Sequence, residues 1–111
     1  MSTNGYVDGI EVLWRPGCPF CSSLRRGLRR RAIATTEINI WKDQHAAERV
    51  RAVTGGDETV PTVFVGNVAM VNPSVNDIVT AVEAEFPERA QEMLAGGRDA
   101  ARRSWWSRIL G

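Results

Sequence analysis

The two cysteines of this 111-residue chain, Cys18 and Cys21, stand where one sequence pattern gives way to another. The preceding run, Gly9–Trp14, is short and rich in β-favouring residues, whereas the residues after Pro19 repeat apolar side chains at helical spacing. A Cys-x-x-Cys pair between a strand and a helix, next to a βαβ pattern, indicates a redox motif. This junction constrains the fold more than any other feature of the chain.

Four strands and three helices are expected along residues 9–85. Gly66-Asn67 between two apolar runs predicts a tight hairpin turn, Asp43 and Ser74 are expected to cap helices, and Gly55 is expected to end one. In the first helix, Cys21, Leu24, Leu28 and Ala32 recur on one face. The order is β-α-β-α-β-β-α, an α/β fold with a mixed four-stranded central sheet. We expect strands at 9–14, 36–41, 61–65 and 68–71, and helices at 19–34, 43–54 and 74–85.

Residues 88–111 follow the last of these expected elements. We therefore divide the chain into a redox domain, 1–87, and a C-terminal extension, 88–111. The extension is basic and amphipathic, and we expect it to be helical. Its Trp105-Trp106 either docks on the domain or lets residues 98–111 lie on an anionic membrane surface. No apolar run is long enough to span a bilayer, and the first residues lack a secretory pattern, so we expect a cytoplasmic protein.

The position of the cysteine pair predicts its chemistry. Cys18 at the N-cap of the helix can accept hydrogen bonds from the backbone N–H groups of Phe20 and Cys21, and Pro19 suits the first helical position. The helix dipole favours a thiolate there, so we predict Cys18 as the nucleophile and Cys21 as the resolving thiol. A zinc site is disfavoured because His45 is the only histidine and a second cysteine pair is missing. Two inert buried cysteines are the remaining alternative.

Three motifs together resemble the glutaredoxins of the thioredoxin superfamily. Cys18-Pro-Phe-Cys21 is similar to the dithiol active site of that family, and Thr59-Val-Pro61 is similar to its Thr-Val-Pro loop. Gly55-Gly-Asp-Glu-Thr-Val-Pro-Thr-Val63, followed by Val71-Asn-Pro-Ser74, most resembles the mycoredoxin branch, which uses mycothiol. The resemblance covers about residues 9–86 and implies a thioredoxin/glutaredoxin-like fold. It also implies that Val60-Pro61 is cis and faces the active sulfur.

The resemblance also suggests which residues contact substrate, with Cys18 and Cys21 as the catalytic pair. In glutathione-using relatives, a Gly-Gly pair before the last helix holds the γ-glutamyl carboxylate, whereas this chain has Asn72-Pro73. The co-substrate is therefore mycothiol or glutathione, with mycothiol fitting the change, and we expect neither a metal nor a tightly bound cofactor. The predicted substrate-binding residues are Arg15, Pro19, Phe20, Thr59, Val60, Pro61, Asn72 and Ser74.

The function implied is a thiol–disulfide oxidoreductase that reduces mixed disulfides between proteins and a small thiol. One alternative is a thioredoxin-like dithiol donor recharged by a flavoprotein disulfide reductase. A non-enzyme alternative is a module of the same fold that carries an iron–sulfur cluster or serves as an adaptor. We expect a monomer.

Residues 15–31 hold six arginines and no acid. This run is either a solvated helix face or a field that favours the thiolate and steers acidic partners. No interleaved platform of aromatic residues accompanies the arginines, so we do not expect nucleic-acid binding.

Overall fold

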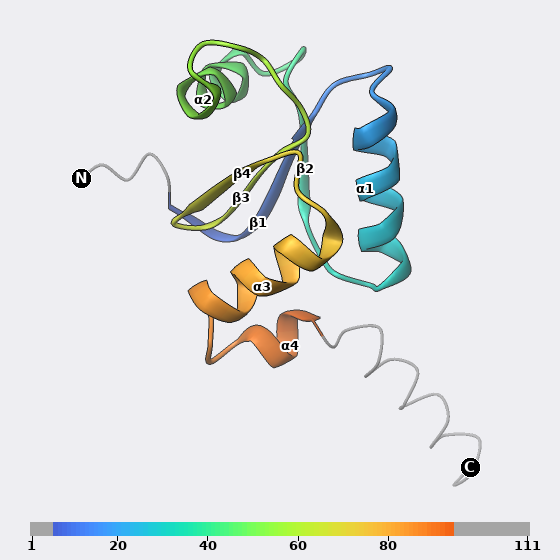
Figure 1. Ribbon diagram of the computed structural model, residues 1–111, viewed down its shortest axis with the longest axis vertical. Helices are drawn as coiled ribbons and strands as arrows, with labels where there is room; N and C mark the ends of the chain where they lie inside the picture. The colour runs from blue at the N-terminus through green and yellow to red at the C-terminus, as the bar shows by residue number, and fades with distance from the viewer. Residues whose placement is uncertain (1–5, 95–111) are drawn as a thin grey trace, which may run out of the picture.

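The computed structural model describes residues 6–94, which form four strands and four helices (Figure 1). The strands make one sheet in the order β2-β1-β3-β4, in which β1 and β2 are parallel and the other neighbours are antiparallel. The predicted element order and mixed four-stranded α/β sheet are confirmed, with one further short helix at the end. The elements are β1 (Val7–Trp14), α1 (Pro19–Arg30), β2 (Thr36–Asn39), α2 (Gln44–Thr54), β3 (Thr62–Gly66), β4 (Val68–Val71), α3 (Val75–Glu85) and α4 (Ala90–Leu94).

Helices cover both faces of the sheet, and a core lies under each layer. On one face, α1 and α3 pack through residues such as Leu28 and Ile78 against Val12 of β1. On the other face, α2 packs through Val50, and this second core includes both cysteines. Figure 1 shows α2 on one side of the sheet and α1 with α3 on the other. Every residue of β3 is buried because this central strand is covered on both faces.

The hairpin between β3 and β4 turns at Gly66-Asn67, as predicted. Val65 and Val68 face each other across the ladder, which leaves those two residues as the loop. Gly66 has φ +57°, and a Cβ there would lie 2.6 Å from Oε1 of Glu85. The same oxygen accepts a hydrogen bond from the backbone N–H of Asn67 at 2.7 Å. Glycine is required here by both the backbone conformation and the close approach of α3.

Helix α1 ends at Arg30, four residues before the end predicted from the sequence. Ala32 has φ +54° and is exposed, so the prediction that it continues the buried face is wrong. The chain instead brings Ile33 into the core, where its side chain is 5% exposed, and its N–H bonds to the carbonyl of Leu28 at 3.0 Å. Burial of Ile33 therefore overrides the helix propensity of the neighbouring alanines.

The first two strands also differ at their ends from the prediction. Strand β1 begins at Val7, two residues early, and β2 stops at Asn39 and not at Trp41. The side chain of Asn39 accepts the backbone N–H of Trp41 at 2.9 Å, and its carbonyl accepts the N–H of Lys42 at 3.0 Å. These two bonds make a turn, which ends the strand and leaves the Trp41 side chain 63% exposed.

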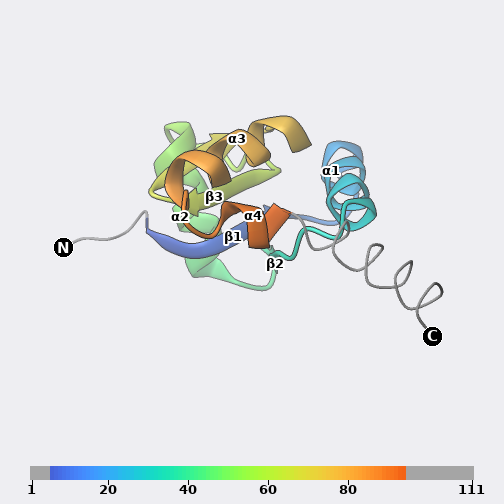
Figure 2. The same ribbon diagram turned by 90° about the horizontal axis from the view of Figure 1, so that it is seen from below.

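Helix α4 lies beside α3 in both views (Figures 1 and 2). Ala90 is buried and Met93 and Leu94 pack against the core shared by α1 and α3. Packing thus continues past residue 87, and the domain boundary proposed there stays a prediction. The expectations for residues 98–111, including the tryptophan pair, lie outside the described residues. Within residues 6–94, no helix is long and apolar enough to cross a bilayer.

Candidate active site

One end of the sheet gathers the segments that the sequence singles out. Parallel strands β1 and β2 both end there, β3 begins there because it is antiparallel to β1, and β4 returns to it. We call this end, with its segments 15–21, 40–43, 59–61 and 71–74, the cysteine edge. Along it the strand ends follow in the order β2, β1, β3, β4, so the cysteine motif after β1 lies between the other segments.

Cys18 is the N-cap of α1, with extended backbone angles φ −102° and ψ 108°, and Pro19 occupies the first turn. The backbone N–H of Cys21 donates to Cys18 Sγ at 3.2 Å, so the predicted cap is confirmed for one of its two expected donors. The cap places the sulfur at the positive end of the helix dipole. Cys18 is only 7% exposed, so the sulfur of a substrate must reach a recessed position.

The Val60-Pro61 peptide bond is cis, as predicted. The carbonyl of Val60 faces the active sulfur, and Cys18 Sγ donates to it over 3.7 Å. Both cysteines are free thiols in this structure. The sulfur of Cys18 therefore lies between a backbone donor from α1 and a backbone acceptor from the loop before β3.

Cys21 differs from Cys18 in its surroundings, being 1% exposed in the core beneath α2. Burial raises the pKa of the Cys21 thiol from an ordinary value of 9.0 to about 12, and its hydrogen bond with Cys18 adds to the rise. Arg15 acts in the opposite direction on the pKa of Cys21, through a backbone hydrogen bond and its charge. Cys21 thus remains a protonated thiol at neutral pH, which suits a resolving group more than a first nucleophile.

The remaining predicted site residues lie in segments of the cysteine edge, and their roles stay predictions. Pro19, Phe20 and Thr59 are exposed around the motif, and Arg15 is half-buried. The backbone N–H of Asn72 donates to the Pro61 carbonyl at 2.7 Å, which ties the segment after β4 to the cis loop.

Ser74 is engaged in capping α3. Its hydroxyl accepts the N–H of Asp77 at 3.0 Å, and Asp77 Oδ2 accepts the N–H of Ser74 at 2.9 Å. The capping box predicted from the sequence is therefore present. If the Ser74 hydroxyl contacts substrate, it must do so while it also accepts the hydrogen bond from the N–H of Asp77.

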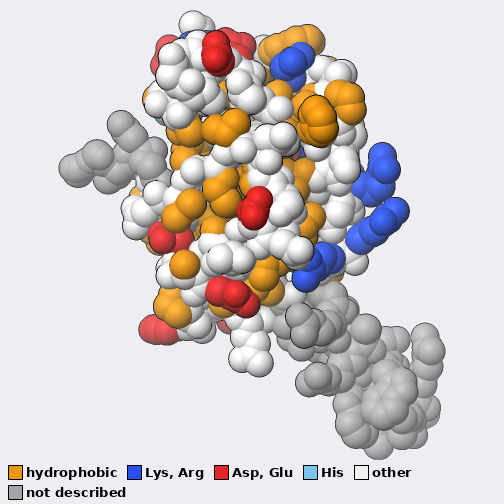
Figure 3. All heavy atoms as spheres, in the orientation of Figure 1, with side chains coloured by type: hydrophobic (Ala, Val, Ile, Leu, Met, Phe, Trp, Pro, Cys, Tyr) orange, Lys and Arg blue, Asp and Glu red, His pale blue; other side chains and the backbone are white. Residues whose placement is uncertain are grey.

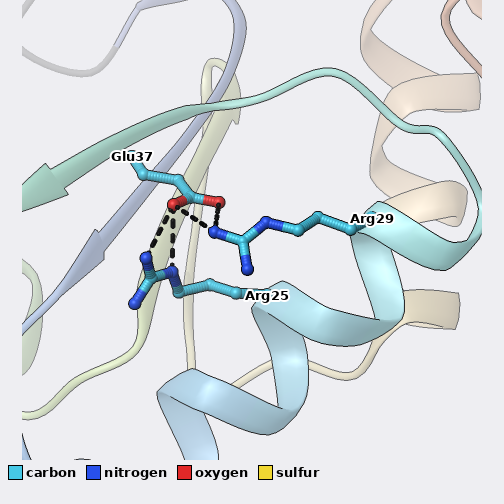
Figure 4. A network of polar contacts seen from close by, with 3 residues as sticks. All are labelled: Arg25, Arg29 and Glu37. Carbon is cyan, nitrogen blue, oxygen red and sulfur yellow. Dashed lines mark hydrogen bonds and ion pairs between the residues drawn. The ribbon is translucent and has the colours of Figure 1, made fainter.

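The arginines of α1 are partly neutralised by an acid that sequence reasoning missed. Glu37 of β2 accepts Arg25 at 2.9 Å and Arg29 at 3.1 Å, as Figure 4 shows. The Arg25 guanidinium also lies 4.0 Å from the centre of the Trp14 ring, and Trp14 packs against the core that holds both cysteines. Basic side chains nevertheless stand along the α1 side of the molecule (Figure 3). Glu37 lies 12 residues from Arg25, so spacing within one helix gave no signal of this pairing.

No cluster of three or more His, Cys, Asp or Glu side chains is placed to hold a metal ion within residues 6–94.

The comparisons with known proteins agree with this geometry. A family model described as Glutaredoxin matches residues 10–70, more than half of the chain. The chain belongs to the glutaredoxin family. A glutaredoxin-type protein of Mycobacterium tuberculosis is 39% identical over 62 residues, which are 55% of this chain and 74% of that relative. Mycoredoxin 1 of Corynebacterium glutamicum is 31% identical over 79 residues, which are 70% of this chain and 98% of that relative.

Solved structures show the same fold. A mutant of a thioredoxin-like protein has a TM-score of 0.61 at 22% identity, covering 69% of this chain and 97% of the other. A glutaredoxin of Archaeoglobus fulgidus has a TM-score of 0.58 at 18% identity, covering 68% of this chain and 87% of the other. The predicted family, with its mycoredoxin-like branch, and the thioredoxin-type fold are thereby confirmed. As a glutaredoxin, the protein is a thiol–disulfide oxidoreductase.

Proposed function

We propose that this glutaredoxin reduces mixed disulfides between protein cysteines and mycothiol in the cytoplasm, acting as a monomer through Cys18. The observation that carries the choice of thiol lies at residues 72–74, before α3. The N–H of Asn72 is bonded to the Pro61 carbonyl at 2.7 Å, and that of Ser74 to Asp77 Oδ2 at 2.9 Å. Pro73 has no N–H at all.

Glutathione needs free donors at this place in the family, because its γ-glutamyl carboxylate is held by backbone N–H groups before the last helix. Mycothiol has no γ-glutamyl group and loses nothing when these donors are occupied or missing. The chemistry of residues 72–74 therefore supports mycothiol over glutathione as the co-substrate. It also accounts for Asn72-Pro73 standing where glutathione-using relatives have glycines.

The proposed reaction proceeds by thiol–disulfide exchange at Cys18. Its thiolate attacks the mycothiol sulfur of the mixed disulfide, the protein leaves as a thiolate, and a Cys18–mycothiol disulfide forms. A second mycothiol thiolate then attacks the mycothiol sulfur of this disulfide. The attack returns the Cys18 thiolate and releases oxidised mycothiol as a disulfide dimer. The two electrons that reduce the protein thus come from two mycothiol molecules.

A second route has direct support in the placement of Cys21. Its backbone nitrogen lies 3.2 Å from Cys18 Sγ and its side chain is hydrogen-bonded to that of Cys18, which supports exchange between the two thiols. Cys21 would then displace mycothiol, giving a Cys18–Cys21 disulfide that a flavoprotein disulfide reductase or further thiol reduces. This is the alternative function, a dithiol donor in the manner of thioredoxin.

The test compares turnover of one protein's mixed disulfides with mycothiol and with glutathione, each with its own thiol as reductant. We expect kcat/KM to be about tenfold or more higher with mycothiol, since one charged hydrogen bond is worth roughly 1.5–3 kcal/mol. Equal or better turnover with glutathione would contradict the assignment. The Cys21→Ser variant should retain activity with mycothiol. Loss of that activity in the variant would favour the dithiol donor.

A proline variant tests the reasoning at residues 72–74 directly. Pro73→Gly restores a backbone N–H before α3 and is expected to raise kcat/KM with glutathione while leaving mycothiol turnover nearly unchanged. Pro87→Gly, which removes an exposed proline beyond α3, is the control for the loss of a proline and should change neither rate. A glutathione gain in both variants would point to a general effect of losing a proline.

A further inference from the structure

Exposed apolar side chains are concentrated at the cysteine edge. Among residues 6–94, the large hydrophobic side chains that stand exposed are Tyr6 at 51%, Phe20 at 64%, Trp41 at 63% and Val71 at 42%. All but Tyr6 belong to segments of the cysteine edge. Figure 3 shows apolar side chains at the surface near the start of α1, at the same end of the molecule. An exposed tryptophan at the same edge of the sheet as a reactive sulfur calls for an explanation beyond stability, because its side chain buries little apolar surface here.

Trp41 lies on the opposite side of Cys18 from the proposed thiol site. The strand ends follow in the order β2, β1, β3, β4, so Trp41 after β2 flanks the motif on one side. Segments 59–61 and 72–74, which lead into β3 and follow β4, flank it on the other. A mixed disulfide has two halves, and its sulfurs must meet Cys18 between these flanks. When the small thiol takes the β3–β4 flank, the protein half faces the β2 flank.

The backbone of Trp41 is held in place while its side chain is free. Its N–H donates to Asn39 Oδ1 at 2.9 Å, and the next residue continues the turn by bonding to the Asn39 carbonyl. On the inner side, Ile40 is 3% exposed and its N–H bonds to the Trp14 carbonyl at 2.9 Å, which anchors this segment to β1. An aromatic side chain on a fixed backbone has few rotatable bonds and loses little entropy on binding, which is a property of protein-binding hot spots.

We propose that Trp41 is a docking residue for the protein half of the mixed disulfide, binding an apolar side chain next to the substrate cysteine. The partner is an extended polypeptide segment, since the recessed Cys18 sulfur admits a narrow chain more readily than a folded surface. Trp41 selects among protein substrates and takes no part in the exchange of the small thiol. This inference rests on the proposed function.

The test uses three mixed disulfides of mycothiol. Two are short peptides with one cysteine, flanked by Leu and Phe in one and by Ser and Gln in the other, and the third carries 2-mercaptoethanol. Wild-type protein is expected to prefer the apolar peptide about tenfold in kcat/KM, the size of a typical interface anchor. Trp41→Ala should abolish that preference and change kcat/KM for the 2-mercaptoethanol substrate by less than roughly twofold. Trp41→Phe should restore most of the preference for the apolar peptide.

Tyr6→Ala is the matched control, because Tyr6 is also an exposed aromatic residue, at 51%, but precedes β1 at its far end, roughly 25 Å along the strand. It should leave all three substrates unchanged. An equal loss on all three substrates in Trp41→Ala would overturn the proposal and place Trp41 against the small thiol. No loss on any would overturn it as well. Failure of the wild-type protein to turn over even the 2-mercaptoethanol substrate would instead reject the proposed function.

Discussion

The buried thiol of Cys21 leads to a quantitative prediction about its reactivity. In a Cys18→Ser variant Cys21 is the only cysteine, and burial, the largest cause of its raised pKa, remains. A thiol with the ordinary pKa of 9.0 is about 9% thiolate at pH 8, whereas one with a pKa of about 12 is about 0.01% thiolate. These fractions differ about 900-fold in the intact site. The Cys18→Ser variant loses the smaller contributions of Cys18 to the raised pKa and keeps that of burial, so we expect alkylation to be slowed by up to about 900-fold, and the 1% exposure of the side chain slows it further.

The assay is iodoacetamide alkylation followed by mass spectrometry, from pH 7 to the highest pH at which circular dichroism shows the variant folded. The same protein unfolded in guanidinium gives the reference rate for an ordinary thiol. Cys21→Ser, in which Cys18 alone reacts, serves as the matched variant and is expected to be alkylated faster than Cys18→Ser. In the folded Cys18→Ser protein, the rate should still be rising tenfold per pH unit above pH 9.

The pH profile separates the effect of the raised pKa from simple burial. A thiol that is merely hidden reacts slowly, but its rate reaches half of its maximum near pH 9 and then levels off, as that of the unfolded reference does. A half-maximal rate near pH 9 in the folded variant would refute the argument that burial keeps Cys21 protonated. A folded rate within about tenfold of the unfolded rate at pH 8 would refute it too, since burial is the largest cause of a pKa rise whose full size corresponds to about 900-fold.

Two further predictions concern the framework of the site. Gly66→Ala should destabilise the protein by about 1–3 kcal/mol, because alanine at φ +57° is strained and its Cβ would lie 2.6 Å from Glu85 Oε1; thermal unfolding should show a lower Tm, and an unchanged Tm would contradict the close approach. Ser74→Ala should cost about 1 kcal/mol through the lost N-cap bond to Asp77; KM for the mycothiol disulfide stays unchanged if capping is its only role, and a raised KM would support the substrate contact predicted from the sequence.

Much of the fold could be predicted because local chemistry determines it. The caps at Cys18, Asp43 and Ser74 and the Gly66-Asn67 turn each depend on a few neighbouring residues whose side chains or torsions suit one conformation. The end of α1 could not be predicted in this way. Residues 31–34 carry good helix formers, but the core on the α1 face needs Ile33, and a turn at Ala32 delivers it.

The arrangement of the candidate site was predictable to the same extent. The cysteine pair and the cis loop carry recognisable motifs, and their meeting follows from the strand order. Glu37 and Trp41 belong to no recognisable motif. Glu37 pairs with Arg25 of α1 because it lies on β2, and Trp41 is exposed at the cysteine edge because a turn follows β2. Their roles arise only when the sheet brings β2 next to β1.

The pairing of Glu37 also changes how the arginine-rich run is interpreted. Two of its arginines, Arg25 and Arg29, share one carboxylate on β2, so the positive charge of residues 15–31 is smaller in the folded protein than the residue count implies. With Arg25 stacked on Trp14, this contact also joins α1 to the strand that leads into the cysteine motif. Exposed charges elsewhere on α1 are screened within about 8 Å at physiological salt. The groups that act on the sulfurs at short range are therefore the backbone N–H of Cys21, the carbonyl of Val60 and the nearby Arg15.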